Sequence, residues 1–77
     1  MDAVQCRMAR AAVGLGVRDL AKMAGVAVDT VVRLERGEEL KPGTVEKIRA
    51  VLEGEGLEFI EANGGGPGVR LMGSTNG

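Results

Sequence analysis

The sequence contains no histidine, one cysteine and one aromatic residue, and these shortages exclude several kinds of function. Without histidine there is no cysteine–histidine nucleophile pair and no His/Cys ligand set for zinc, and one cysteine cannot build a disulfide framework. Cys6 is therefore interpreted as a small core residue. Phe59, the single aromatic side chain, cannot supply the stacking platforms with which proteins bind single-stranded nucleic acids. We expect no catalytic site, no metal and no cofactor.

Long apolar runs are also missing, and the overall charge is small. No run approaches the roughly 20 apolar residues that cross a bilayer, so we expect a soluble cytoplasmic protein without a membrane partner. A chain of 77 residues is one small domain for which burial alone is marginal, so a dimer interface would add stability. The net charge of −1 divides into +1 for residues 1–43 (seven basic, six acidic) and −2 for residues 44–77 (three basic, five acidic). Any basic face must lie in the first half.

Helix-forming residues and glycine breaks divide most of the chain. Helical periodicity is present in four segments, at residues 2–13, 17–24, 28–36 and 42–53. Their apolar stripes are Val4, Met8 and Ala11 or Ala12 in the first segment, Leu20, Ala21 and Ala24 in the second, Val31 and Leu34 in the third, and Val45, Ile48 and Leu52 in the fourth. Gly14 and Gly25 suit left-handed residues at helix ends, and Pro42 suits a first helical turn.

The chain changes character after the "GEG" at residues 54–56. Short β-prone runs at 57–60 and 69–72 flank the glycine-rich stretch "EANGGGPG", which predicts a hairpin or a pair of strands. The glycine run is interpreted as a loop and not as a nucleotide-binding loop, because no Lys-Ser/Thr pair and no long helix follow it. Residues 73–77 are predicted to be a flexible tail.

Two short helices joined through a glycine turn, with the second helix amphipathic, are the layout of a helix-turn-helix motif. Small or apolar residues are needed where two such helices cross steeply, and these positions hold Leu20, Ala21, Gly25, Val31 and Leu34. Ala21 lets the second helix approach, and Gly25 turns the chain. A plain helical hairpin would satisfy some of these positions as well.

From Arg10 onward the stretch "RAAVGLGVRDLAKMAGVAVDTVVRLERGEELKPGTVEKI" resembles the Cro/C1-type (XRE) helix-turn-helix regulators, over roughly residues 5–53. "LERG", followed by a Lys-Pro loop and another amphipathic helix, is especially typical. The resemblance implies a mainly α fold: a four-helix, lambda-repressor-like DNA-binding domain at residues 1–54, followed here by a short β-hairpin or strand pair at 55–72. It also implies a buried or half-buried salt bridge between Arg10 and Glu35; two unrelated surface charges are the alternative.

In that family the third helix enters the DNA major groove and its exposed side chains read base edges. Carried over by position, the base-reading residues are Val17, Val28, Asp29, Val32 and Arg33, and the phosphate contacts are Arg18, Thr30, Arg36, Lys41 and Gly43. Arg33 is the clearest hydrogen-bonding reader and suits the O6 and N7 atoms of guanine, while the outward valines suit thymine methyl groups. Asp29 is interpreted either as an acceptor for a cytosine amine or as a capping or selectivity residue.

Four positions depart from the family pattern, among them the outward Val28 and Val32, which are apolar where the family often has polar readers. Ala27 precedes the third helix where the family often has Ser or Thr, so Asp29 or Thr30 is expected to help satisfy the first N–H groups. Val17 opens the second helix where the family often has Gln. Each departure places an apolar residue where the family often has a polar one.

The β-prone segment needs cover, because a two-stranded hairpin alone is marginal in water. Its apolar residues are predicted to form a homodimer interface, and folding back onto the fourth helix is the alternative. The interface prediction comprises Leu57, Phe59, Ile60, Val69 and Leu71, with Leu57 and Phe59 on one face and Val69 and Leu71 on a matching face.

We therefore expect a sequence-specific transcriptional regulator, a repressor or autoregulator, that binds a pseudo-palindromic double-stranded DNA operator as a homodimer and takes no small-molecule ligand. The alternative is a protein-interaction module on the same scaffold, an anti-activator or antitoxin, that sequesters a partner protein. The net negative charge and the outward valines favour this alternative. The basic residues Arg18, Arg33, Arg36 and Lys41 oppose it.

Overall fold

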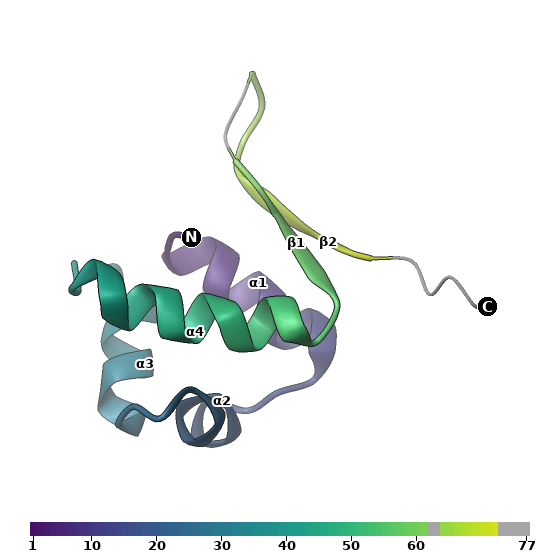
Figure 1. Cartoon of the computed structure of the whole chain (residues 1–77). Helices are drawn as coiled ribbons and strands as arrows, with labels where there is room; N and C mark the ends of the chain where they lie inside the picture. The colour runs from purple at the N-terminus through teal and green to yellow at the C-terminus, as the bar shows by residue number, and fades with distance from the viewer. Residues whose placement is uncertain (62–63, 73–77) are drawn as a thin grey trace.

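The computed structural model describes residues 1–61 and 64–72, which form four helices and one two-stranded antiparallel sheet (Figure 1). In chain order the elements are α1 (Ala3–Val13), α2 (Val17–Ala24), α3 (Val28–Glu35), α4 (Pro42–Gly54), β1 (Leu57–Ile60) and β2 (Gly68–Leu71). The predicted mainly α fold with a C-terminal strand pair is confirmed. The predicted tail at 73–77 lies outside the described residues. Among the described residues, none of the helices combines the length and the apolar character that a membrane span requires.

Local residues decide where the helices begin and end. The Asp2 carboxylate accepts a hydrogen bond from the Gln5 backbone N at 2.8 Å, and the Gln5 side chain accepts from the Asp2 N at 3.0 Å. The sequence predicts a helix from residue 2, but this reciprocal cap keeps Asp2 outside it. Gly14 and Gly25 adopt φ angles of 72° and 71°, which confirms both as left-handed helix ends. Pro42 occupies the first turn of α4.

One hydrophobic core runs through the helices and the hairpin together. Its buried side chains are Cys6, Ala9, Leu20, Ala21, Val31, Leu34, Ile48, Leu52, Leu57 and Phe59. The inward positions predicted for α3 are confirmed, and so is the core position of Cys6. Burial of each large aliphatic side chain contributes about 1.5–3 kcal/mol, so this cluster is the main source of stability.

The predicted apolar stripe of α1 is wrong. Its buried positions are Gln5, Cys6 and Ala9, whereas Val4, Ala11 and Ala12 are exposed. The reason is a polar clamp: Gln5 Nε2 donates to the carbonyls of Ile60 at 2.9 Å and Gly68 at 3.0 Å. This face of α1 therefore turns toward the hairpin, a long-range contact that apolar spacing within the helix does not reveal.

The hairpin packs against α1 and α4, which lie between it and the α2–α3 pair (Figure 1). Leu57 pairs with Leu71, and Phe59 pairs with Val69. The second strand covers residues 68–71 and so begins one residue earlier than the predicted range of 69–72. The inward face is thus covered by the chain itself: Leu57 and Phe59 are buried in the core, and Val69 is half-buried against it.

Two of the five residues predicted for the dimer interface remain exposed. Leu71 is 56% exposed at the end of β2, and Ile60 is 37% exposed. Because side chains alternate along a strand, Ile60 lies on the opposite face of the hairpin from Leu71. The two residues therefore do not belong to one continuous apolar surface.

Candidate nucleic-acid interface

Small residues let α2 and α3 pack closely across a tight turn. Ala21 of α2 is buried, and Gly25 provides the left-handed residue after the helix. Val31 and Leu34 of α3 point into the core, so α3 is anchored along one side. The opposite side of α3 is consequently left to solvent.

The exposed side of α3 carries two parallel rows of side chains. Val28 and Val32 are 41% and 39% exposed, and Asp29 and Arg33 are exposed beside them. Residues four apart are neighbours on a helix surface, so one row is apolar and the other charged. The expectation that Val28 and Val32 point outward is confirmed. Their roles toward bases stay predictions.

The N-terminus of α3 is open. Ala27 precedes it in an extended conformation and supplies no side-chain cap. The first backbone N–H groups of a helix lack partners within the helix and carry a partial positive charge. The start of α3 is therefore a position of partial positive charge, which the Asp29 carboxylate in the same turn offsets.

The residues predicted to touch phosphates surround α3 on several elements. Arg18 is exposed in the first turn of α2, and Arg36 is exposed at the end of α3. Lys41 is the N-cap residue of α4, and Gly43 lies in the first turn of that helix. Val17 is half-buried and packs against the core, so less of it is available to a base than of the α3 valines.

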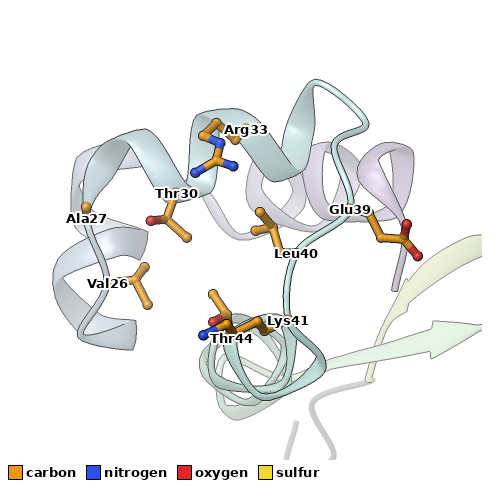
Figure 2. A pocket seen from close by; sticks show the side chains of 8 residues that line it. All are labelled: Val26, Ala27, Thr30, Arg33, Glu39, Leu40, Lys41 and Thr44. Atoms are coloured by element: carbon orange, nitrogen blue, oxygen red, sulfur yellow. The ribbon is translucent and has the colours of Figure 1, made fainter.

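A cleft separates α3 from the start of α4 (Figure 2). It is lined by Val26, Ala27, Thr30, Arg33, Glu39, Leu40, Lys41 and Thr44. The Arg33 guanidinium points into the cleft, and the Glu39 carboxylate points away from it (Figure 2). The cleft thus brings together three predicted DNA-contacting residues, Thr30, Arg33 and Lys41, whereas Val17 and Arg18 lie outside it on α2.

The end of α3 places a carboxylate beside Arg33, a feature that sequence reasoning missed. Gly37, at φ 96°, donates its N–H to the Leu34 carbonyl, and Glu38 N donates to the Arg33 carbonyl, both at 3.0 Å. This is the Schellman pattern of helix ends. The glycine after "LER" is the sequence signal that could have located it.

Glu38 binds two arginines with its side chain. Its Oε1 accepts from Arg33 Nε at 2.9 Å, and its Oε2 accepts from Arg36 Nη2 at 2.8 Å and Arg36 Nε at 3.2 Å. These hydrogen bonds, first from Arg33 and then from Arg36, lower the pKa of Glu38. All three groups are solvent-exposed, so the two ion pairs are easily exchanged for other partners.

A second arginine–glutamate pair lies inside the domain, as predicted. Arg10 Nε and Nη2 donate to Glu35 Oε2 and Oε1 at 2.8 and 2.9 Å, and Glu35 is 8% exposed. Cys6 Sγ donates to Glu35 at 3.3 Å, and Arg7 donates to its backbone carbonyl. This pair ties α1 to the end of α3.

The surroundings of the buried pair determine its protonation. Burial opposes ionisation of Glu35, but hydrogen bonds from Arg10 and Cys6 outweigh it, so the pKa of Glu35 is lowered. Burial, reinforced by the neighbouring carboxylate, raises the pKa of the Cys6 thiol to about 12. The thiol stays protonated and serves as a donor.

Two helices that meet at a glycine turn, with the second presenting a charged and an apolar row to solvent, define a helix-turn-helix domain. The helix-turn-helix family model matches residues 7–59, and the chain belongs to this family, of the Cro/C1 type. It is a family of domains of DNA-binding transcription regulators.

A relative from Archaeoglobus fulgidus is 38% identical over 69 residues, and its name provisionally assigns it to the HTH-type transcriptional regulatory proteins. The match covers 82% of this chain and 22% of the relative, so the chain spans about a fifth of that protein's length.

Proposed function

We propose that the chain binds double-stranded DNA sequence-specifically through α3 and regulates transcription, acting as a repressor on a pseudo-palindromic operator. The observation that supports this most directly is the solvent-exposed pair of rows on α3. Basic residues lie on the neighbouring segments: Arg18 in the first turn of α2, Arg36 at the end of α3 and Lys41 at the start of α4. Such an arrangement combines base readers with phosphate contacts.

The two rows suit different features of the major groove. Val28 and Val32 are apolar and suit thymine methyl groups, the apolar feature of this groove. Arg33 can donate two hydrogen bonds to guanine O6 and N7, which is worth about 1–3 kcal/mol of discrimination. Asp29 can accept from a cytosine amine or, by repelling phosphates, restrict how α3 enters the groove. The proposed site is therefore one guanine next to thymines.

A gel-shift with the DNA upstream of the coding sequence tests this function. Wild-type protein should shift the duplex, the shift should weaken as salt rises, and Arg33→Ala should lose it. Arg70→Ala is the matched control, because Arg70 is an exposed arginine on the hairpin with its own partner, Glu58. No shift at micromolar protein and low salt, or equal loss in both variants, would contradict the proposal.

We further propose that a second copy of the chain covers the hairpin at the C-terminal end of β2, opposite its turn. The sheet has two strands in the described part, so each strand has one edge without a strand partner there. Leu71 and Met72 at this end are 56% and 57% exposed. A dimer would cover them and join two reading heads, which doubles the phosphate contacts on a two-fold symmetric site.

The dimer is tested by light scattering after size-exclusion chromatography. Leu71→Lys should shift the protein from dimer to monomer, because a charge would be buried against an apolar surface. Met23→Lys introduces the same charge at an exposed position on α2 and should leave a dimer. A monomeric wild type would refute the interface while leaving the DNA-binding proposal intact.

A protein-interaction module is the second candidate, and one observation favours it. Glu38 pairs with both Arg33 and Arg36 and cancels one of their two positive charges, so the exposed valines make up a larger part of what this face presents. Binding through those valines would be far less sensitive to salt than binding to phosphates. Complexes that persist at high salt, together with no shift of any DNA, would support this candidate over the first.

A further inference from the structure

We propose that Glu38 is a specificity-determining residue of the DNA-binding surface: it orients Arg33 toward a base and restrains Arg33 and Arg36 from binding phosphates without regard to sequence. The inference rests on the proposed function, that α3 reads DNA. Glu38 is negatively charged and would repel DNA phosphates, and this repulsion is what makes it a determinant of specificity.

The position of Glu38 is set by backbone hydrogen bonds. Its N–H donates to the carbonyl of Arg33, the same residue that its carboxylate binds. Gly37 makes this possible, because its φ of 96° is a conformation that other residues rarely adopt. The carboxylate is therefore held beside the Arg33 side chain by the way α3 ends.

The hydrogen bond between Arg33 and Glu38 uses one particular nitrogen. Nε of Arg33 donates to Oε1, so the terminal nitrogens Nη1 and Nη2 extend beyond the contact. Two donors side by side are what a guanine needs for contacts to O6 and N7. Glu38 can thus hold the guanidinium by its inner nitrogen while the outer pair binds a base.

Arg36 is restrained more strongly. Both its Nε and its Nη2 donate to Oε2 of the same carboxylate. A phosphate must compete with Glu38 for Arg36, and the carboxylate also repels that phosphate. Because sequence-independent binding depends almost entirely on phosphate contacts, Glu38 weakens it more than it weakens binding to the correct site.

The exposure of the two ion pairs fits this role. Arg33 and Glu38 have side chains that are 44% and 41% exposed, and exposed pairs are weak enough to be rearranged by a ligand. Two other acidic residues lie near Arg33, but neither forms an ion pair with it in the described part of the chain. Asp29 lies one turn away on the same row of α3, and Glu39 points away from the cleft (Figure 2).

The test compares Glu38→Gln with Glu39→Gln. The two variants change the net charge equally, and the Glu38 backbone N–H that closes α3 is retained in both. Glu39 makes no ion pair within residues 1–61 and 64–72, so its variant reports the effect of charge alone. Thermal unfolding of both variants checks that the fold is unchanged.

The DNA probes are obtained by selection with the wild-type protein. Wild-type protein selects duplexes from a random-sequence library, and the most enriched duplex is paired with a shuffled duplex of the same composition. Dissociation constants for both duplexes are then measured over a range of salt concentrations for the wild type and the two variants. A second selection with Glu38→Gln reports changes in base preference.

We expect Glu38→Gln to bind the shuffled duplex about threefold more tightly for each arginine that gains a phosphate, and its salt slope to steepen by about 0.9 per contact. The ratio of specific to non-specific affinity should fall by about fivefold, the lower end of what a two-bond arginine–guanine contact provides. The second selection should show a relaxed guanine position. Glu39→Gln should change the ratio little.

The failures are distinguishable. If wild-type protein enriches no sequence, the proposed function fails and this inference fails with it. If wild-type protein enriches a sequence but Glu38→Gln has the same affinity ratio as Glu39→Gln, the proposed function stands and the role of Glu38 is refuted. Equal gain or equal loss on both duplexes also refutes it, because specificity would then be unchanged.

Discussion

Two arginine–glutamate pairs involve α3, and they differ both in geometry and in environment: Arg10 donates two hydrogen bonds to Glu35, whereas Arg33 donates one to Glu38. Arg10–Glu35 and Arg33–Glu38 have shortest nitrogen–oxygen distances of 2.8 and 2.9 Å. The side chains of the first pair are 24% and 9% exposed, those of the second 44% and 41%. Exposure decides what each pair can do, because charge interactions are strong where water is excluded and weak where it is not.

The first pair therefore belongs to the fold and the second to the surface that we propose binds DNA. Removing one partner of a buried pair leaves an unpaired charge in the interior, whereas removing one partner of an exposed pair leaves a solvated one. The same two residue types serve stability at one place and exchangeable contacts at the other. Substitutions that separate these roles test the comparison.

The largest effect is expected from Arg10→Met. It leaves the Glu35 carboxylate buried without its main partner, which should lower the free energy of unfolding by about 3–5 kcal/mol. Urea unfolding measures the loss, and Arg70→Met on the exposed Arg70–Glu58 pair is the matched control, with an expected loss of about 1 kcal/mol or less. The double variant Arg10→Met/Glu35→Leu should recover much of the stability; no recovery would contradict the argument from the buried charge.

Acid should also weaken the buried pair. The pKa of Glu35 lies below the ordinary 4.5, so its stabilising contribution is present above that value and is lost as pH falls through the lower, folded-state pKa. Unfolding free energies measured from neutral pH downward should fall in the acid range below about 4.5. The Arg10→Met/Glu35→Leu variant should lose less over the same range. Identical pH profiles would show that Glu35 does not contribute to the acid sensitivity.

A smaller effect is expected from Gly37→Ala, which acts on the positive-φ turn between Glu35 and Glu38, the two carboxylates of these pairs. A side chain at a positive φ costs about 1–2 kcal/mol, and open space around Gly37 means that the cost is conformational and not steric. Gly43→Ala is the control, because Gly43 has equally open space without a positive φ. Thermal unfolding should separate the two variants; equal stability would argue against the strain at Gly37.

The smallest effect on stability is expected from Glu38→Gln. Solvent screens an exposed pair, so the unfolding free energy should change little while DNA specificity changes measurably. Denaturation and DNA binding on the same protein sample compare the two quantities. A large loss of stability would place Glu38 with Glu35 as a structural residue and would erase the contrast between the pairs.

Much of the fold and part of the site could be predicted from the sequence. The four helices, the left-handed glycines Gly14 and Gly25, and the outward Val28 and Val32 are local consequences of periodicity and conformational preference. The Arg10–Glu35 pair is long-range and was available only through the family resemblance. The contacts of Glu38 with Arg33 and Arg36 are local in sequence, and Gly37 is the signal that could have located the helix end that places them.

What only the tertiary structure decided is which surfaces remain free. Gln5 holds the hairpin against α1 by hydrogen bonds. Leu57 and Phe59 are then buried in the core of the same chain and are not left exposed for a dimer interface. No pattern within a single segment contains this outcome, because it depends on contacts between residues more than fifty positions apart. The sequence determined the elements and the character of the α3 surface through short-range spacing. The packing of distant segments decided that this surface stayed exposed and that Leu57 and Phe59 of the hairpin did not.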